Sequence, residues 1–385
     1  MLLDRAGKFV TQLNGYKAFI PKPLPPDPPL RYDEKLQFLL SEADRALARL
    51  EGVATVLSNR DLFVAIFAKK EALLSSQIEG IQASLEGILL LEANITPGEN
   101  KAETKKVLKY IEAMNFGIQR IRENDFTLSS SFIKEIHKIL IKRVRGSFSI
   151  PGEFRISQTW IGPPGASIKR AIFIHPPKYL LEELMSDLEK FILTEDKIPP
   201  LIKIALIHAQ FETIHPFLEG NGRIGRLLIT LYLFWKGILS RPLLYLSLYL
   251  KKNKDKYNDL LMRIRFKGDW ERWLKFFLQG AIEASEEALS SAKEIIELKE
   301  DLIERLLAKK IGGIFAIKFM DILFEKPLIS IPDIANNLRA NLQTAINLVD
   351  KFQDFGILRE ITGKQRFRKY LFVDYIDIIA RGTEI

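Results

Sequence analysis

Residues 215–226 read His-Pro-Phe-Leu-Glu-Gly-Asn-Gly-Arg-Ile-Gly-Arg, and this stretch decides how the rest of the chain is interpreted. His215 is the one side chain in it whose unperturbed pKa lies near neutrality, so it can take a proton from an attacking hydroxyl group. Glu219 offers a carboxylate, the oxygen ligand that Mg²⁺ takes together with substrate phosphates. A base and a magnesium ligand this close together predict a site for a polyphosphate substrate.

The small residues and the arginines of the same stretch predict a cradle for the phosphates. Residues 220–222, Gly-Asn-Gly, tolerate positive φ and leave backbone N–H groups free to form an anion-binding nest. Arg223 and Arg226 are spaced i, i+3, so both project from one face if a helix begins after the loop, and each can fork onto phosphate oxygens. The apolar run 224–235 predicts that helix as a buried one, with its dipole directed at the phosphates.

The composition is that of an ordinary soluble protein, since 47% of the residues are hydrophobic and 27% are charged. A chain of 385 residues is long enough for two or three domains. No apolar run is long enough to span a bilayer, the N-terminus meets charged residues too early for a secretory signal, and there are no cysteines. We therefore expect a cytoplasmic protein with no membrane partner. The net charge of +9 fits an anionic partner, nucleotide or nucleic acid, but it is equally a plain solubility charge.

Apolar periodicity predicts a mainly α fold. A proline-rich segment, 19–30, is expected as an extended strap packed over the surface. Three regions follow from the pattern: a helical N-terminal region 1–100, a helical core 101–308, and a separate unit 314–380 after the Gly312-Gly313 interruption. Helical patterning begins near residue 33, breaks at 94–100 and resumes at 104–121, 130–144, 178–193 and 201–213.

Residues 155–174 depart from the helical pattern and predict a β-hairpin. Trp160 and Ile161 precede a Gly-Pro-Pro-Gly turn region, and an apolar run at 171–174 follows it. A small hairpin inside a helical domain leaves an unpaired edge, which can bind an extended peptide by strand addition. The alternative is a surface excursion without a binding role.

The unit 314–380 shows the order helix, helix-turn-helix and hairpin that is typical of a winged helix. Basic residues cluster between 364 and 369 in the hairpin, as a phosphate-binding footprint would require. Asp350 and Asp354 lie on the helix that would enter a major groove, where acids oppose DNA binding. Winged helices also bind proteins or dimerise, so DNA and protein remain open as partners of this unit.

A second stretch also has a residue spacing that favours a functional role, Ser75-Ser76-Gln77-Ile78-Glu79-Gly80. Ser75 and Glu79 are spaced i, i+4 on one helix face, so the hydroxyl can steady the carboxylate. Gly80 is the usual residue to end such a helix. From these residues alone, Glu79 is by default a solvated surface acid.

Residues 215–226 resemble the signature of the Fic family, HxFx[DE]GNGRxxR, without a gap. The resemblance continues through 151–155, 244–247 and 257–265 and into the winged tail. It implies AMP transfer from ATP, with Mg²⁺, to a Tyr, Ser or Thr hydroxyl of a protein docked on the 155–174 flap. It assigns catalysis to His215, the metal to Glu219, and nucleotide binding to Gly220, Asn221, Gly222, Arg223, Ile224, Gly225, Arg226, Tyr257 and Asn258.

The stretch 75–80 is similar to the inhibitory motif of the same family, [ST]xxxE[GN]. The resemblance implies that Glu79, with Ser75, pairs with Arg226 and competes with the γ-phosphate of ATP for this arginine. A bidentate carboxylate–guanidinium pair of this kind is hard to break. One departure concerns the adenine, since Tyr257-Asn258 stands where similar proteins carry a tyrosine pair.

Other functions remain open at the level of sequence. The protein is alternatively a DNA-binding regulator that senses a nucleotide, or a Fic enzyme that removes AMP or transfers another phosphate-containing group. Modification of the protein itself and assembly into a homodimer also remain open. A zinc site built from His175, His208 and His215 is disfavoured, because no pair of them has a typical ligand spacing.

Overall fold

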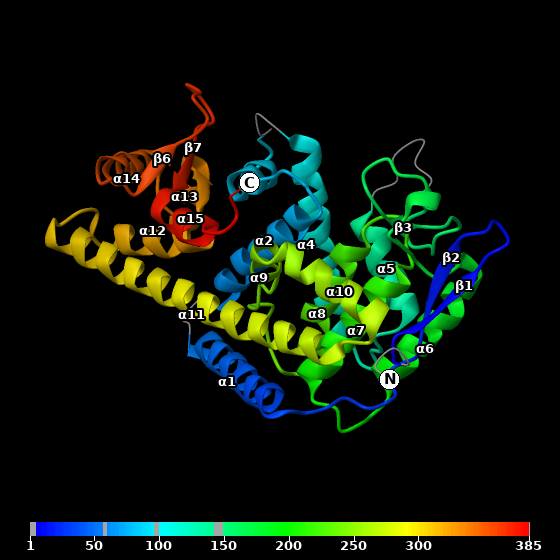
Figure 1. Cartoon of the computed structure of the whole chain (residues 1–385). Coiled ribbons are helices and arrows are strands. Elements are labelled where there is room, and N and C mark those ends of the chain that lie inside the picture. The colour runs from blue at the N-terminus through cyan, green and yellow to red at the C-terminus, as the bar shows by residue number, and fades with distance from the viewer. Residues whose placement is uncertain (1–4, 57–59, 96–99, 142–148, 385) are drawn as a thin grey trace.

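The computed structural model describes residues 5–56, 60–95, 100–141 and 149–384, without the side chains of 54–56 and 60–64. Parts of two predicted features lie outside these residues, namely 96–99 of the expected break and 142–144 of the expected helix. Helices dominate the fold, with three small sheets at its edges (Figure 1). No helix among the described residues is long and apolar enough to cross a bilayer.

Two central helices, α7 (Pro200–Ile214) and α8 (Asn221–Trp235), pack against each other and frame residues 215–220. Their apolar residues occur on every side, which is typical of helices with no solvent-facing stripe. Every residue from Leu201 to Ile214 is buried. The surrounding helices are α1 (Glu34–Val56), α2 (Arg60–Ile78), α3 (Leu85–Glu92), α4 (Lys101–Ile121), α5 (Ser130–Leu140), α6 (Leu181–Leu193), α9 (Ser247–Lys252), α10 (Lys254–Lys267) and α11 (Trp270–Ala308).

Two antiparallel hairpins lie side by side at one end of the core (Figure 1). In the flap, β3 (Trp160–Ile161) pairs with β4 (Phe173–Ile174), so the hairpin is where the sequence predicted it but with strands of only two residues. The other hairpin joins β1 (Gly7–Thr11) to β2 (Lys17–Pro21) and differs from the prediction, which placed residues 19–21 in an extended strap. Phe19 of β2 packs on Phe173 of β4 with ring centroids 5.4 Å apart, and this tertiary contact stabilises both hairpins.

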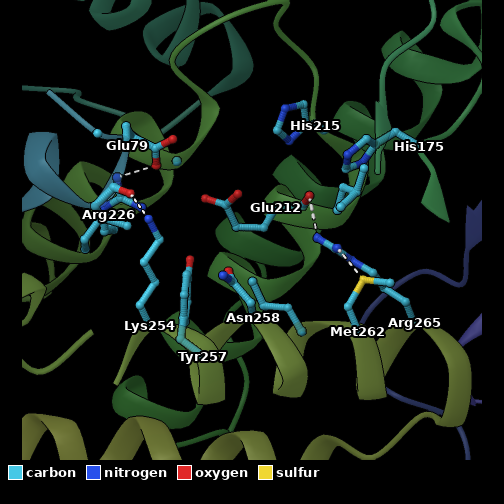
Figure 2. A pocket seen from close by; sticks show the side chains of 15 residues that line it. Glu79, His175, Glu212, His215, Arg226, Lys254, Tyr257, Asn258, Met262 and Arg265 are labelled. Atoms are coloured by element: carbon cyan, nitrogen blue, oxygen red, sulfur yellow. Dashed lines mark hydrogen bonds and ion pairs between the residues drawn. The ribbon is translucent and has the colours of Figure 1, made fainter. Parts of the chain in front are cut away.

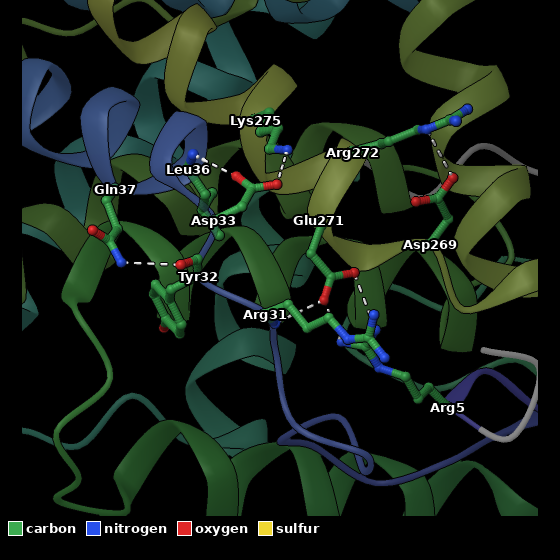
Figure 3. A network of polar contacts seen from close by, with 10 residues as sticks. All are labelled: Arg5, Arg31, Tyr32, Asp33, Leu36, Gln37, Asp269, Glu271, Arg272 and Lys275. Carbon is green, nitrogen blue, oxygen red and sulfur yellow. Dashed lines mark hydrogen bonds and ion pairs between the residues drawn. The ribbon is translucent and has the colours of Figure 1, made fainter. Parts of the chain in front are cut away.

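The chain after β2 has no helix or strand up to α1 and bends at 24–25 and 27–28, so it is less regularly extended than the sequence predicted. Residues of this segment, and Arg5 before β1, are held to the beginning of α11 (Figure 3). Both guanidinium Nη atoms of Arg5 donate to the Glu271 carboxylate at 3.0 Å. The backbone N–H of Arg31 donates to the same carboxylate at 2.9 Å. Asp33 accepts from Lys275 at 2.5 Å, so the segment enters α1 already held against α11.

The C-terminal unit follows α11 and has the winged-helix order that the sequence predicted. It comprises α12 (Gly313–Glu325), α13 (Ile331–Leu338), α14 (Leu342–Asp354) and a sheet in the order β5-β7-β6, formed by Leu328–Ser330, Lys369–Phe372 and Leu358–Glu360. The sequence missed β5 and the last helix, α15 (Val373–Ala380). This helix returns to the core, where it contacts α11 and α2 (Figure 1).

Candidate active site

The loop between α7 and α8 places the beginning of α8 beside a cleft, which Gly222 lines. His215 closes α7 in the left-handed conformation with φ 52°, and Gly220 precedes α8 with φ 83°. The helix begins at Asn221, earlier than the sequence predicted, so only Gly220 of the three small residues uses positive φ. The first backbone bond of this turn runs from Ile224 N–H to Gly220 C=O at 3.0 Å. The preceding N–H groups at the start of α8 are therefore available to an anion.

Asn221 holds this loop in shape. Its Oδ1 accepts from the Phe217 N–H at 2.9 Å, and its Nδ2 donates to the Phe217 C=O at 2.7 Å. Asn221 is 2% exposed, so both bonds are shielded from water. The side chain is thus committed to the protein, and what Asn221 can offer a phosphate is its backbone N–H.

His215 lies half-buried at the edge of the cleft and stacks on His175, with ring centroids 4.2 Å apart. Burial, together with the charges of Arg265 and Arg155, lowers the pKa of His215 to about 3. Its Nδ1 has no hydrogen-bond partner among the described residues. Arg155 fixes the backbone here, donating from Nε to the His215 C=O at 2.8 Å. The imidazole is therefore neutral at physiological pH, the form that can accept a proton.

Glu79 reaches the same site from the end of α2, and it binds Arg226 (Figure 2). Arg226 donates from Nη2 to Glu79 Oε1 at 2.7 Å, from Nε to Ser75 Oγ at 2.9 Å and from Nη2 to the Ser75 C=O at 2.8 Å. The Ser75 hydroxyl thus contacts the arginine, whereas the sequence argument had it steadying the carboxylate. A Cβ atom on Gly222 would lie 2.1 Å from Glu79 Oε1, so the carboxylate lies directly against the first turn of α8.

The electrostatics of the pair favour its ionised form. Burial would raise the pKa of Glu79, but Arg226, with Arg223 and His215, outweighs burial and holds the pKa below its usual value. Burial acts on Arg226 in the lowering direction, and Glu79 overcomes it to raise the pKa of the guanidinium. Glu79 is therefore a negative charge at the place where the sequence predicted a phosphate.

A cleft of about 510 Å³ extends from this pair across α10. Lys254, Tyr257 and Asn258 of α10 line it. The Tyr257 hydroxyl forms a buried hydrogen bond of 2.9 Å with His208 Nε2. Figure 2 shows Arg265 on the side opposite Arg226, with Glu212 between them. Apolar side chains also line the cleft, namely Ile78, Ile161, Leu261 and Met262.

Arg223 and Glu219 complete the predicted set. Arg223 is 3% exposed, and its Nη1 has no hydrogen-bond partner in the described part of the chain. Glu219 is exposed, and its backbone C=O accepts from His137 Nε2 at 3.1 Å. Gly152 N–H donates to His137 Nδ1 at 2.9 Å, so Nε2 must carry the proton. The described residues include no group of three or more His, Asp or Glu that could hold a metal ion.

Several residues of the site were not predicted from sequence. Glu212 and Arg265 come from α7 and α10, and His137 braces the loop by stacking on Phe217 with ring centroids 3.8 Å apart. Arg155 joins the loop to the flap, since its Nη2 donates to the Pro176 C=O at 2.7 Å. Arg155 and Arg265 lie within the stretches 151–155 and 257–265 that the resemblance covers, but their contacts reach across long sequence separations and no local pattern gives them a role. For Glu212, its position three residues before His215 was the available signal.

Comparison with known families agrees with this geometry. The chain matches the model of the N-terminal region of the Fic/DOC family over residues 38–119 and that of the Fic/DOC family itself over 127–233. The chain belongs to the Fic family. Residues 317–370 of this Fic protein match a helix-turn-helix DNA-binding domain. The predicted fold class, a helical Fic core followed by a winged-helix unit, is confirmed.

Relatives of the Fic protein carry a named activity. It is 26% identical over 201 residues to a probable protein adenylyltransferase of Aquifex aeolicus, covering 52% of this chain and 55% of that one. It is 29% identical over 220 residues to the protein adenylyltransferase Fic of Aedes aegypti, covering 54% of this chain and 40% of that one. The chain thus spans about half, or less, of the length of these curated relatives.

Solved structures share the fold. A Fic family protein of Desulfovibrio desulfuricans superposes with a TM-score of 0.57 at 19% identity, covering 90% of this chain and 98% of that one. A Fic domain-containing signalling protein of Bacteroides thetaiotaomicron gives a TM-score of 0.53 at 18% identity, covering 68% of this chain and 97% of that one. The first of these likenesses extends over nearly the whole chain.

Proposed function

We propose that this Fic protein is a protein adenylyltransferase, which transfers AMP from ATP to a Tyr, Ser or Thr hydroxyl of a protein. One observation carries the proposal: the neutral His215 and the open first turn of α8, flanked by Arg223 and Arg226, meet at one end of a cleft. The cleft, at about 510 Å³, has the size of a small-molecule site. The activity named for its relatives supports the same reaction.

The chemistry follows from the positions of these groups. The phosphates of ATP lie at the beginning of α8, and Arg223 and Arg226 supply positive charge to their oxygens. The hydroxyl oxygen attacks the α-phosphorus, its proton passes to the His215 imidazole, and the bond from the α-phosphorus to the bridging oxygen breaks. Pyrophosphate leaves, and AMP remains on the hydroxyl oxygen. Positioning and charge stabilisation provide most of the rate acceleration.

Glu219 is the proposed protein ligand of Mg²⁺. One exposed carboxylate beside the phosphate site suits an ion that takes most of its other ligands from phosphates and water. When bound there, Mg²⁺ would neutralise phosphate charge. The remaining task of the loop is to hold Glu219 in place, and the Asn221 and His137 contacts do this.

Glu79 is the proposed inhibitor of the reaction. Its carboxylate binds Arg226 and lies against Gly222, so it occupies the place of a terminal phosphate and adds repulsion to any phosphate that approaches. ATP then has to bind in another orientation, with its α-phosphorus away from the attacking hydroxyl. Removal of the carboxylate leaves Arg226 charged and available.

The flap is the proposed docking edge for the modified protein, whether a separate target or another molecule of this chain. Trp160 is 39% exposed and Ile161 is 37% exposed, and the strand they form has β4 on one side only. An extended peptide added to that strand would present its hydroxyl toward His215. We propose 1–100, 101–308 and 314–380 as the corresponding inhibitory, catalytic and winged-helix regions.

The test uses the Glu79→Gly protein, in which inhibition is removed, and the double variant that also carries His215→Ala. Incubation with α-labelled ATP and Mg²⁺ should label the first protein and leave the second unlabelled, with unchanged circular dichroism. Equal labelling of the two proteins would exclude His215 as the base. Loss of AMP from a previously modified protein, with no gain of label, would instead identify an enzyme that removes AMP.

A role in DNA binding is the second candidate, favoured by the helix-turn-helix match and by the exposed basic wing. Lys364, Arg366 and Arg368 are all exposed on the loop between β6 and β7. Gel-shift measurements on the full chain should then show binding that weakens with salt and falls in a variant with Arg366→Ala and Arg368→Ala. Binding that both substitutions leave unchanged would contradict a DNA-binding wing.

A further inference from the structure

Glu212 is a buried carboxyl group that the proposed reaction does not use. It lies on α7, three residues before His215, and is 7% exposed. Figure 2 shows its carboxyl group pointing into the middle of the cleft, between Arg226 and Arg265. Its Oε1 has no hydrogen-bond partner among the described residues. A buried acceptor left without a donor costs free energy, so a donor is expected to arrive with a ligand.

The neighbouring helix is shaped to make room for this group. A Cβ atom on Gly225 would lie 2.5 Å from Glu212 Oε1, so any larger residue at 225 would displace the carboxyl group. Burial raises the pKa of Glu212 to about 7, with Arg226 and Arg265 opposing the rise and Glu79 adding to it. Perturbed carboxyl groups in clefts are typical of functional sites. Ionised or protonated, the group keeps an oxygen that can accept a hydrogen bond.

The position of Glu212 relative to the phosphate site identifies the donor. Gly225 lies three residues beyond Gly222 in α8, or about 4.5 Å along the helix axis. Phosphate oxygens are acceptors and repel a carboxylate, whereas sugar hydroxyl groups are donors. In a nucleoside triphosphate the sugar adjoins the phosphates, and the base lies farther away, where Leu261 and Met262 of the cleft lining can contact it. Glu212 therefore faces the sugar.

We propose that Glu212 is a specificity residue, which accepts a hydrogen bond from a ribose hydroxyl group of the bound nucleotide. The proposal rests on the proposed function only in that the cleft binds a nucleoside triphosphate. A site built to bind a hydroxyl group rejects the analogue that lacks it, because the buried partner is then left unbonded. The protein should thus discriminate between ATP and its deoxy analogues.

Calorimetric binding of ATP, 2′-deoxy-ATP, 3′-deoxy-ATP and inosine triphosphate to the Glu79→Gly protein tests this. We expect ATP to bind about 10- to 100-fold more tightly than one of the deoxy analogues, as for a hydrogen bond to a charged group. Glu212→Ala should abolish that ratio, and Glu212→Gln, which keeps an acceptor oxygen, should restore part of it. Glu297→Gln, an exposed substitution on α11, is the matched control and should leave the ratio unchanged.

Several results would overturn the proposal. One is a sugar preference that survives in Glu212→Ala, and another is an equal loss of affinity for ATP and both deoxy analogues, which would indicate an action through Arg226. A change confined to the ratio between ATP and inosine triphosphate would assign Glu212 to the base. Because binding is measured without transfer, failure of the adenylyltransferase activity would leave this test intact.

A separate observation concerns Gln77, which lies between Ser75 and Glu79 in the inhibitory stretch. Its Nε2 donates to the Thr383 C=O at 2.7 Å, and its Oε1 accepts from Lys251 Nζ at 2.8 Å. Thr383 follows α15, so the winged-helix unit is hydrogen-bonded to the inhibitory stretch across 306 residues of sequence. Figure 1 shows this end of the chain beside α2.

Residues 381–384, here called the tail segment, fit closely against the core. Lys251 Nζ also donates to the Glu384 C=O at 2.6 Å and the Gly382 C=O at 3.3 Å. A Cβ atom on Gly382 would lie 2.5 Å from Leu248 Cδ1, and Thr383 is 6% exposed. The tail segment therefore holds Gln77 in a partly buried, specific contact.

We infer that the tail segment is a clamp that links the position of the winged-helix unit to inhibition by Glu79. Movement of the unit away from the core removes the Thr383 C=O from Gln77 and leaves it only Ala83 and Lys251 as partners. This loosens the end of α2 and shifts Glu79 away from Arg226. A ligand that binds the unit only when it is displaced would thereby activate the enzyme. The inference deepens the proposed function, on which its activity readout rests.

Substitution of Gln77 by Ala in the full chain tests the clamp. Self-labelling with α-labelled ATP should rise severalfold above wild type, while Gln279→Ala, at a partly exposed position on α11, should leave it unchanged. In the Glu79→Gly background, Gln77→Ala should add nothing, because both act on the same contact. Backbone amide exchange over 75–80 should increase in Gln77→Ala.

The outcomes separate the two proposals. Labelling of Glu79→Gly without a rise in Gln77→Ala would refute the clamp and leave the adenylyltransferase in place. Absence of label in every variant would refute the activity, and amide exchange would then decide on the clamp alone. Unchanged exchange over 75–80 would overturn it.

Discussion

Replacement of Asn221 by Ala distinguishes a side chain that holds the loop from one that binds nucleotide. The substitution removes two buried hydrogen bonds, both to the backbone of Phe217, and leaves its N–H and C=O without these partners. Each lost partner costs about 1–3 kcal/mol, so we expect a total of about 2–5 kcal/mol. This loss of folding stability should be measurable in the absence of nucleotide, because both hydrogen bonds form in the protein without nucleotide.

This loss converts into a measurable shift. With an unfolding entropy of about 2.1 cal/mol/K per residue and a cooperative unit of about 300 residues, the unfolding midpoint falls by about 3–8 °C. Scanning calorimetry without ATP measures it, and Asn115→Ala, an exposed substitution on α4, is the control. A midpoint within about one degree of wild type, combined with weaker ATP binding, would refute the loop-holding role and assign the side chain to the nucleotide.

Three further predictions concern the inhibited state and the metal. The pKa of Glu79 is held below its usual value of 4.5, so its charge persists as pH falls from about 8 to about 5.5. The ratio of labelling in Glu79→Gly to labelling in wild type should therefore stay constant over that range. A ratio that falls to one near neutral pH would contradict the ion pair. Ser75→Ala leaves the buried Nε of Arg226 without its 2.9 Å partner, so the free energy of unfolding in chemical denaturation should fall by about 1–3 kcal/mol. Ser76→Ala is the control and should cost less, because the Ser76 hydroxyl donates to Ala72 within α2. Equal losses in the two variants would contradict a stabilising Ser75–Arg226 contact. Glu219→Gln should raise the Mg²⁺ concentration for half-maximal labelling severalfold, and an unshifted Mg²⁺ titration would remove Glu219 from the metal site.

The sequence alone predicts a candidate site at residues 215–226 because the residues that carry its proposed chemistry are close together in the chain. His215, Glu219 and the two arginines lie within one short stretch, and the resemblance to the Fic signature covers every one of them. The helix after the loop was also predictable from its apolar run, although its first residue was not. Asn221 enters the helix because its side chain is bonded back to Phe217, and no local propensity reports such a bond.

Contacts between distant segments were beyond local patterns. The Glu79–Arg226 pair joins residues 147 apart, and only the family resemblance suggested it. Glu212 read as an ordinary helix residue, since its role depends on the absence of a side chain at Gly225 on another helix. The hairpin β1–β2 was missed because part of its stability comes from packing of Phe19 on Phe173 of the flap, which is distant in sequence.

The central claim is that this protein transfers AMP and that Glu79 restrains the transfer. Wild type and Glu79→Gly should be incubated with Mg²⁺ and either α-labelled or γ-labelled ATP, and the protein-bound label measured. The account predicts strong incorporation of the α label by Glu79→Gly, weak incorporation by wild type and no incorporation of the γ label. Incorporation of the γ label, or α labelling of wild type equal to that of Glu79→Gly, would contradict it.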